Sequence, residues 1–556
     1  MAVTVNYSRI DKYIVRAQLR QPLHVGSASQ GTGEVLVDPL DGKPFVQASG
    51  IAGVFRRCYE YCFADQQGAM DLFGSGDQLA GRIRITDGRF LEGQSGIRTE
   101  LRPRIRINPV TGTSAAARGA GSDAVSGQKF ETEYIGAGAK IEFRVYVYGG
   151  QETVEKNREN NDPESLSAMI PEKVMMTEQD RMESVFALIH AGQVQFGGQK
   201  SNGCGSMEVL ELLHHRFDMH TREGRNDWVL EGPQDNLAYQ DRVPHLKELL
   251  QHSGFSPRTY SITLQGRTEG SLLVKAIALT GEQTAKFAEK GEKEPDYINM
   301  MNAGGMYIIP GSSVKGAVRA QIDRIAGYLE NTHEMRKSPT REPKNNEGGF
   351  DKKQLLNELF GRVGKKKDTG SAGNVRFYDV LVGKVPEHAQ EVISNRIHID
   401  RFTGGVMNTG LFREQAVYGS LQIKAAVMNR GSGRETSAEA DRACGILALA
   451  LRDLALGMYN LGSGYSIGRG FLLADSLTVR RADGAEAVIT FWRDSRPEGE
   501  DPGVSSGVEP DACSPVRMRL QDPDRILDQC LRALWNMQSG DNVSGTSGAF
   551  PGKEEA

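Results

Sequence analysis

The sequence predicts an α+β protein made of two tandem ferredoxin-like (RRM-like) domains, one in each half of its 556 residues. The first observation behind this class is a weak internal repeat, in which glycine-rich loops and basic turns occur twice in the same order. The second is that each copy shows the order strand, helix, strands, helix, loop, strand. A repeat this long indicates two fused domains rather than a short-repeat solenoid.

Four pairs of segments carry the repeat. In chain order, residues 47–56 match 310–319, 71–74 match 358–361, 104–112 match 396–404, and 197–205 match 462–470. The third pair is the strongest, since Arg-Ile-Arg-Ile-Asn-Pro-Val-Thr-Gly is answered in the second copy by Arg-Ile-His-Ile-Asp-Arg-Phe-Thr-Gly. The spacing between partners differs from pair to pair, so insertions separate the two copies.

Each copy is expected to begin with a strand, because residues 11–24 and 260–280 alternate between apolar and polar side chains. A helix is expected after Gly311, because apolar residues recur at helical spacing and a serine can cap the free N–H groups. Its first turn carries Lys315 and, four residues on, Arg319. Cations at this end oppose the helix dipole, which makes sense where a phosphate binds there.

Later elements follow the same order in both copies. The cleanest alternation in the chain lies at residues 139–148, and its partner strand is 420–427. Helices at about 176–193 and 437–459 then precede the last pair of glycine loops.

These elements set the expected domain limits. We expect a first domain at residues 1–215, a linker at 216–257 with a short helix at 245–251, and a second domain at 258–480. A C-terminal extension at 481–556 ends in a Gly/Ser/Glu-rich tail that we expect to be disordered.

The composition, with 38% hydrophobic and 25% charged residues, is that of a globular protein, and no apolar run is long enough to cross a bilayer. The first residues lack the basic and apolar regions of a signal peptide, so we expect a cytoplasmic location and no membrane partner. The six cysteines favour buried, inert thiols over disulfides or a zinc site. A net charge of −4 gives no general attraction to nucleic acid, so RNA binding must depend on local basic clusters.

The Gly-Ser-Ser helix start at 311–319, the Leu-Phe-Gly turns and the late glycine loops resemble the RAMP superfamily of CRISPR-associated proteins. The resemblance covers residues 10–212 and 258–480 and is closest to the backbone subunits of type III effector complexes. A tandem fusion of two such domains is similar to type III-D systems. The resemblance implies that guide CRISPR RNA, target single-stranded RNA and other effector subunits are the partners.

In the family, the segments matching 105–135 and 397–417 form β-hairpin thumbs that wedge between stacks of the guide–target duplex. The second copy supplies apolar tip residues, for which a place in the core is the alternative; they are Phe402, Met407, Leu411 and Phe412.

Basic and polar residues at the repeated motifs are the candidate RNA contacts. Glycines in the late loops let the backbone approach phosphates, although tight turns alone explain them equally well. A solvated surface is the alternative for any single basic cluster, and a place at the core edge is the alternative for His24. The candidates are His24, Ser49, Arg56, Arg104, Arg106, Lys200, Ser312, Ser313, Lys315, Arg319, Arg396, His398, Arg401 and Arg469.

In catalytic members of the family, an aspartate on the loop before the Gly-Ser-Ser helix cleaves target RNA with a divalent metal, most often Mg²⁺. Asp296 stands near that position in the second copy, one residue closer to the helix than the family's usual spacing. In the first copy the position falls on Thr32, whose hydroxyl cannot replace a carboxylate. One cleavage site is therefore expected, with Asp296 as catalytic residue and metal ligand. Glu34 is a substitute in the first copy, whereas Asp38 is expected to be a turn residue.

Three accounts of function follow. In the first, the chain is a metal-dependent endoribonuclease subunit that binds guide RNA and cuts the target once, with its second domain. In the second, it is a non-catalytic scaffold that holds the guide RNA while another subunit cuts. In the third, it is an unrelated two-domain binder of small ligands without salt-dependent affinity for RNA.

Overall fold

The computed structural model describes most of the chain. The described residues are 7–26, 33–63, 65–75, 80–91, 96–105, 129–151, 177–231, 234–253, 258–276, 281–289, 291, 293–337, 350–362, 364, 370–386, 389–428, 438–493 and 516–536. In these ranges, no helix is long and apolar enough to span a bilayer.

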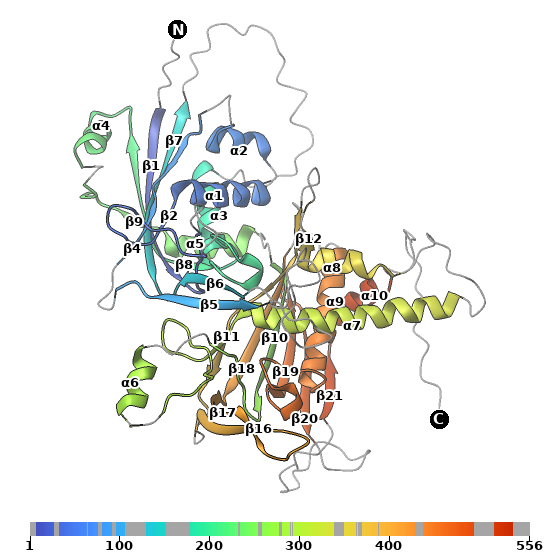
Figure 1. The fold of residues 1–556 in the computed structure, drawn as a ribbon. Coiled ribbons are helices and arrows are strands. Elements are labelled where there is room, and N and C mark those ends of the chain that lie inside the picture. Colours follow the sequence, from blue (N-terminus) through green and yellow to red (C-terminus); the bar gives the residue numbers. More distant parts are fainter. Residues whose placement is uncertain are drawn as a thin grey trace.

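The chain folds into two halves, each built on an antiparallel sheet with helices against one face (Figure 1). We call residues 7–253 the first half and residues 258–536 the second half. The sheet orders are β2-β4-β7-β1-β8-β9 and β11-β15-β18-β10-β19-β20-β21. Their central strands, β4-β7-β1-β8 and β15-β18-β10-β19, follow the same order, which is the order of a ferredoxin-like βαββαβ unit. The α+β fold class with two tandem domains is thus confirmed.

The first half contains these elements in chain order: β1 Tyr7–Leu19, β2 Phe45–Val46, α1 Ala48–Phe63, α2 Gln66–Phe73, β3 Ile83–Ile85, β4 Gly88–Leu91, β5 Thr99–Ile105, β6 Lys129–Ile135, β7 Lys140–Gln151, α3 Glu178–His190, the 3₁₀ turn η1 Lys200–Asn202, β8 Met207–Asp218, α4 Arg222–Asn226, the π-helical turn η2 Asp227–Glu231, β9 Gln240–Asp241 and α5 Val243–Ser253.

The second half contains β10 Arg258–Glu269, α6 Gly281–Glu289, β11 Ile308–Ile309, α7 Gly311–Lys337, α8 Lys352–Phe360, β12 Gly361–Arg362, β13 Ser371–Ala372, β14 Val375–Phe377, β15 Val380–Gly383, β16 Glu391–Ile399, β17 Val406–Val417, β18 Ser420–Met428, α9 Ala438–Ala455, the 3₁₀ turn η3 Tyr465–Ile467, β19 Phe471–Arg481, β20 Glu486–Arg493, β21 Val516–Gln521 and α10 Ile526–Asn536.

Each half has its own hydrophobic core between sheet and helices. Alternate residues of β1, such as Tyr13 and Val15, face the helices of the first half, where Phe55 and Cys58 of α1 meet them. This alternation is what a half-buried strand requires. The described cysteines are buried and unpaired, as expected, and burial raises the pKa of the Cys58 thiol to about 11.

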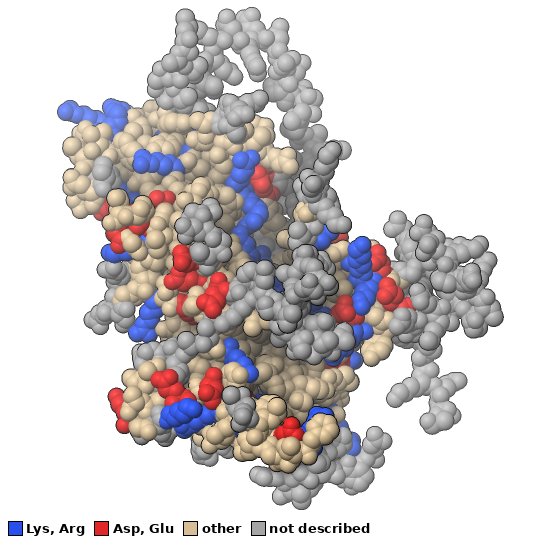
Figure 2. All heavy atoms as spheres, viewed as in Figure 1, with Lys and Arg blue, Asp and Glu red and all other residues tan. Residues whose placement is uncertain are grey.

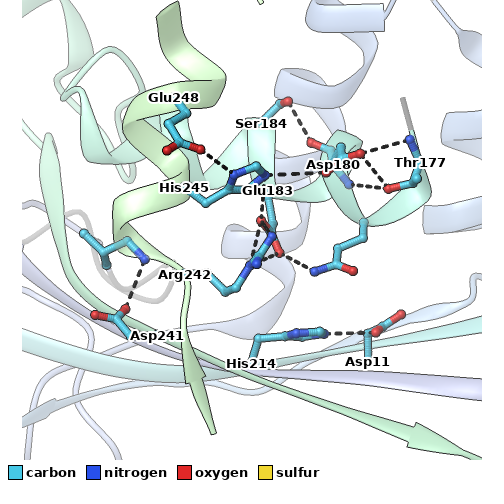
Figure 3. A network of polar contacts seen from close by, with 12 residues as sticks. Asp11, Thr177, Asp180, Glu183, Ser184, His214, Asp241, Arg242, His245 and Glu248 are labelled. Atoms are coloured by element: carbon cyan, nitrogen blue, oxygen red, sulfur yellow. Dashed lines mark hydrogen bonds and ion pairs between the residues drawn. The ribbon is translucent and has the colours of Figure 1, made fainter. Parts of the chain in front are cut away.

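The described residues of 216–257, expected to be a linker, instead pack on the first half (Figure 3). Arg242 donates to both carboxylate oxygens of Glu183 on α3 at 2.9–3.2 Å, and Glu183 is fully buried. Leu246 of α5 is also fully buried in the first core. The expected short helix is present as α5, but hydrogen bonds and apolar contacts between distant segments, which no local pattern shows, fix it to the domain.

Residues 481–536, expected to lie in a C-terminal extension, complete the second half. Strands β20 and β21 extend its sheet beyond β19. Helix α10 packs on α9 and buries Leu534 and Cys530 in the second core. The tail at 537–556 lies outside the described residues.

Two hairpins stand apart from the main sheets. β5 pairs with β6, and β16 pairs with β17, each as a separate two-stranded antiparallel sheet. They lie at the positions predicted for the thumbs, with residues 106–128 of the first thumb outside the described part.

Candidate nucleic-acid interface

The glycine loop of the first half packs directly against the second half, and we call this contact the seam. Gly203, at the end of η1, has a φ of 81°, and a Cβ added there would lie 2.4 Å from the carbonyl oxygen of Phe377. Arg102 of β5 forms two hydrogen bonds to Asp379, at 2.6 and 3.0 Å, with both side chains less than a tenth exposed. Asp379 also accepts from the Gly311 N–H at 2.8 Å and so fixes the start of α7 at the seam.

Lys315 lies at this seam with two other cations. Its Nζ donates to Ser201 of η1 at 2.7 Å. Burial, followed by the charges of Arg319 and Arg104, lowers the pKa of Lys315 to about 8. A polyanion placed among these three cations would remove their repulsion and restore the lysine's charge.

A second cluster of cations surrounds Lys200, in the same glycine loop. Burial, then Arg57 and Arg376, lowers the pKa of Lys200 to about 8. Burial also lowers the pKa of Arg376 to about 10, and this guanidinium donates to the carbonyl of Gln193 at 3.4 Å. Among the described residues, the groups that shift the pKa of Lys200 or Lys315 include no carboxylate. Both clusters are therefore candidate sites for an anion.

These clusters are local features of a mixed surface. In Figure 2, Lys and Arg side chains are interspersed with Asp and Glu rather than covering the visible face. This distribution agrees with the net charge of −4. Any attraction of a polyanion to this surface would then depend on local clusters and not on a general positive field.

The predicted contacts at the helix starts have different surroundings. Ser49 is exposed on the first turn of α1, and Ser312 and Ser313 are half-buried on the first turn of α7. Arg56 is tied within the first half, since it donates to the side chain four residues on at 2.9 Å and to the Gly74 carbonyl at 3.0 Å. Arg56 is thus held by partners within its own half, and Arg319, its counterpart in the second half, lies 5.1 Å from the centre of the Phe360 ring.

His24 lies beside the glycine loop, at the edge of the first core. Its Nδ1 contacts the Glu133 carbonyl oxygen at 2.8 Å, and its ring lies 5.5 Å from the Tyr134 ring. The backbone carbonyl of His24 accepts from the Gly198 N–H at 2.8 Å. The ring therefore packs at the core edge, and the main chain of His24 holds the loop in place.

The second thumb carries Arg396, His398 and Arg401. The Arg396 guanidinium lies 5.4 Å from the centre of the Phe412 ring, and the His398 ring lies 5.3 Å from it. Arg401 is exposed in the turn at the tip. A place in the core, the alternative for the apolar residues expected at the thumb tip, is wrong for three of them. Their exposed fractions are 99% for Phe402, 50% for Met407 and 65% for Leu411.

Arg469, predicted to contact RNA, is instead buried. Its guanidinium forms an ion pair with Glu414 at 2.5 Å, and the two side chains are 9% and 3% exposed. It also lies 3.4 Å from Ser394 of β16. Since Glu414 is buried on the thumb strand β17, the arginine neutralises it and is not presented to a ligand.

Asp296 is exposed at the base of the second thumb. Its Oδ2 accepts from the Arg413 N–H of β17 at 2.7 Å, and its own N–H donates to the Arg413 carbonyl at 2.8 Å. No described residue donates to Oδ1. The carboxylate thus anchors the loop to the thumb through one oxygen and presents the other to solvent.

Lys275, near the same loop, is not among the RNA contacts that the sequence predicts. Its Nζ lies 3.6 Å from the centre of the Tyr297 ring. Burial lowers the pKa of Lys275, with Glu414 acting in the opposite direction. A single lysine after a strand carries no local pattern that would have marked it.

In the first half, Glu34 is exposed and Asp38 is a turn residue, as expected. Asp38 accepts from the Leu40 N–H at 2.9 Å, and it pairs with Arg89. The predictions for Thr32 and Arg106 fall outside the described residues. Across the described ranges, no three His, Cys, Asp or Glu side chains gather closely enough to hold a metal ion.

Comparisons with known proteins complete this picture. A search of curated proteins gave no match. Among solved structures, a chain of the type III-B Cmr-beta complex bound to cognate target RNA is 17% identical, with a TM-score of 0.25, over 37% of this chain and 61% of that chain. The family model of the RAMP superfamily matches residues 16–208 and 219–472, which is most of both halves. The chain therefore belongs to the RAMP superfamily.

Proposed function

We propose that this chain is a backbone subunit of a type III CRISPR effector complex in the cytoplasm, where it holds guide RNA by its phosphates. The observation that carries the proposal is the pair of half-buried lysines, Lys200 and Lys315, each kept beside other cations at the seam. Holding like charges together with reduced access to water is unfavourable in the free protein, and a bound phosphate chain offsets that cost. Membership of the RAMP superfamily supports RNA as the source of these phosphates.

The salt dependence of RNA binding tests this proposal. Each neutralised phosphate on a single strand contributes about 0.7 to the slope of log affinity against log salt. Lys200→Ala with Lys315→Ala should lower that slope by about 1.4 and weaken binding to RNAs of any sequence. Arg525→Ala is the control, because Arg525 is 70% exposed just before α10 and its substitution also removes a positive charge. An unchanged slope in the lysine variant would rule out both lysines as phosphate contacts.

Target cleavage by the second half is the second part of the proposal, with Asp296 as the catalytic carboxylate. Its free Oδ1 faces solvent beside the thumb, where a target strand paired to the guide would pass. Mg²⁺ often binds through one or two carboxylates together with phosphate oxygens and water, so a lone carboxylate oxygen fits such an ion only when RNA is present. When bound, the ion would stabilise negative charge on the phosphate under attack. Asp296 would hold the ion through Oδ1, and a water beside the carboxylate would take the proton of the attacking 2′-hydroxyl. The 5′-oxygen of the next nucleotide would leave with a proton from solvent, giving a 2′,3′-cyclic phosphate.

The scaffold account is favoured by a different observation, since Asp296 already serves as a structural acceptor for the Arg413 N–H. Asp296→Asn separates the two accounts. The asparagine oxygen can still accept that N–H, while the negative charge is lost. If Asp296 is catalytic, cleavage of complementary RNA by the assembled complex stops at one site and RNA affinity is unchanged. If Asp296 only anchors the loop, the complex with Asp296→Asn cleaves complementary RNA normally, and Asp296→Ala destabilises the thumb.

A further inference from the structure

The outer face of the first sheet, away from α1 and α3, is covered by the chain's own residues 219–231 and 234–239, which we call the cap. Figure 1 shows α4, part of the cap, on the opposite side of this sheet from α1 and α2. The Asp235 carboxylate of the cap pairs with Lys12 and Arg144 of the sheet, and Lys12 is fully buried. The Trp228 ring lies 5.8 Å from the Tyr146 ring.

Further contacts seal the cap along β8. The Trp228 ring also lies 5.1 Å from the ring of Phe217, which is fully buried on this outer face. His215 Nδ1 contacts the Ala238 carbonyl at 2.9 Å. A buried lysine with its counter-charge and a layer of aromatic rings make this a fixed packing interface rather than a loose covering.

The matching face of the second sheet is covered differently. Lys12 lies opposite Tyr146 in the first sheet, and Ser261 lies opposite Ala426 at the same place in the second. Arg376, the neighbour of Ala426 on β14, donates to the Gln193 carbonyl just after α3 of the first half. Arg258, on the same strand as Ser261, donates to the Gly192 carbonyl at 3.4 Å. Here the end of α3 and the glycine loop of the preceding half cover the β14 end of the face that the cap occupies on the first sheet, while Gln265, Gln422 and Lys424 on the same face are exposed.

The surface that the first half uses for this docking has an open counterpart on the second half. The segment after α9 corresponds in the repeat to the segment after α3. The equivalent residues are Met458 and Gln193, Tyr465 and Lys200, and Ile467 and Asn202. Asn202 is 7% exposed at the seam, whereas Met458, Tyr465 and Ile467 are 53%, 60% and 44% exposed. We call these three apolar residues the open end.

We propose that the cap blocks the first half against docking of another domain of this kind, so that the chain takes a RAMP-type neighbour only at the open end. That neighbour must present an uncapped sheet face, as the second half does to the first. A second copy of this chain is excluded, because its first sheet is capped. Without the cap, one molecule would expose both the outer face of the first sheet and the open end. Copies of the chain could then join head to tail, and this contact can repeat indefinitely.

Sedimentation velocity of the full chain without RNA tests the proposal. The wild type should sediment as a monomer across the accessible concentrations. The triple variant combines Lys12→Ser and Tyr146→Ala, which introduce the residues found at the same places in the second sheet, with Trp228→Ala. The last substitution removes the ring of the cap that lies against Tyr146 and Phe217. It should form dimers and larger species, and adding Tyr465→Asp should return it to a monomer.

Two results would overturn the inference. One is an uncapped variant that keeps the wild-type circular dichroism spectrum and melts cooperatively but stays monomeric. The other is wild-type protein that self-associates and becomes monomeric with Tyr465→Asp. Trp228→Ala alone, which leaves the Lys12–Asp235 pair in place, provides a milder uncapping should the triple variant not fold. RNA takes no part in these measurements, so their failure leaves the proposed RNA binding untouched.

Discussion

Raising the pH from about 7 to about 9 should weaken RNA binding, because Lys200 and Lys315 lose their protons in the free protein. Their neighbours and their burial lower each pKa to about 8, below the ordinary lysine value of about 10.4. A bound phosphate favours the charged amine and raises the pKa again. The complex then holds more protons than the free protein at pH 8, so binding takes up protons and becomes weaker as pH rises.

The size of the effect follows from these pKa values. If phosphate restores the ordinary lysine pKa of about 10.4, affinity falls nearly tenfold per lysine across this pH interval. Both lysines lie at the rim of the seam and keep some contact with water, which screens part of the interaction. We therefore expect a loss of roughly threefold to tenfold for each lysine and roughly tenfold to a hundredfold for both.

Fluorescence anisotropy with a labelled single-stranded RNA at constant ionic strength measures this loss. Calorimetry in buffers of different ionisation enthalpy measures the proton uptake directly. The matched control is Lys200→Arg with Lys315→Arg, because arginine stays charged throughout this pH range. Its affinity should change little with pH. A wild type whose pH profile is as flat as that of the arginine variant would refute the reasoning.

Three further predictions concern stability and the thumb. Arg102→Met leaves Asp379 and Glu100 buried without their cation and should lower the free energy of unfolding by about 3–5 kcal/mol in thermal or urea melts, while adding Asp379→Asn, whose amide oxygen can still accept the Gly311 N–H, should recover part of that loss. Phe402→Ser should leave the melting temperature unchanged, since Phe402 is 99% exposed, but should weaken binding to a guide–target duplex more than to guide alone. Arg469→Gln leaves the buried Glu414 with only its longer contact to Arg396, at 3.4 Å, and should destabilise the protein by roughly 2 kcal/mol, without altering the salt slope of RNA binding. A slope lower by about 0.7 would instead make Arg469 a phosphate contact.

Elements with strong local periodicity could be predicted from the sequence. The strand expected at 139–148 is Lys140–Gln151, and the helix expected at 437–459 is Ala438–Ala455. In both, the pattern of buried residues follows directly from the period of the element. The thumbs were expected from the resemblance to the family and not from a local pattern, and the hairpins β5–β6 and β16–β17 lie at the expected positions.

Features that depend on contacts between distant residues could not be predicted. Arg469 stands between glycines in a repeated loop, which suggested a phosphate contact, yet its partner Glu414 lies 55 residues earlier on the thumb. Arg376 sits on a short strand among apolar neighbours and becomes part of a cation cluster only when the first half packs beside it. Residues 216–257 looked like a linker because their polar side chains pair with groups of the sheet and of α3, not with one another.

The contrast between the seam and the open end has a physical explanation. At the seam, the halves are joined covalently, so their contact pays no loss of translational freedom and needs little net affinity. A buried pair such as Arg102–Asp379 suits this situation, because it contributes little net stability but fixes one register. Ser394 replaces that arginine at the equivalent position of the second thumb, and the open end presents Tyr465 and Ile467. A neighbour recruited from solution must offset the full entropy of association, and burial of apolar surface supplies the driving force that an ion pair does not.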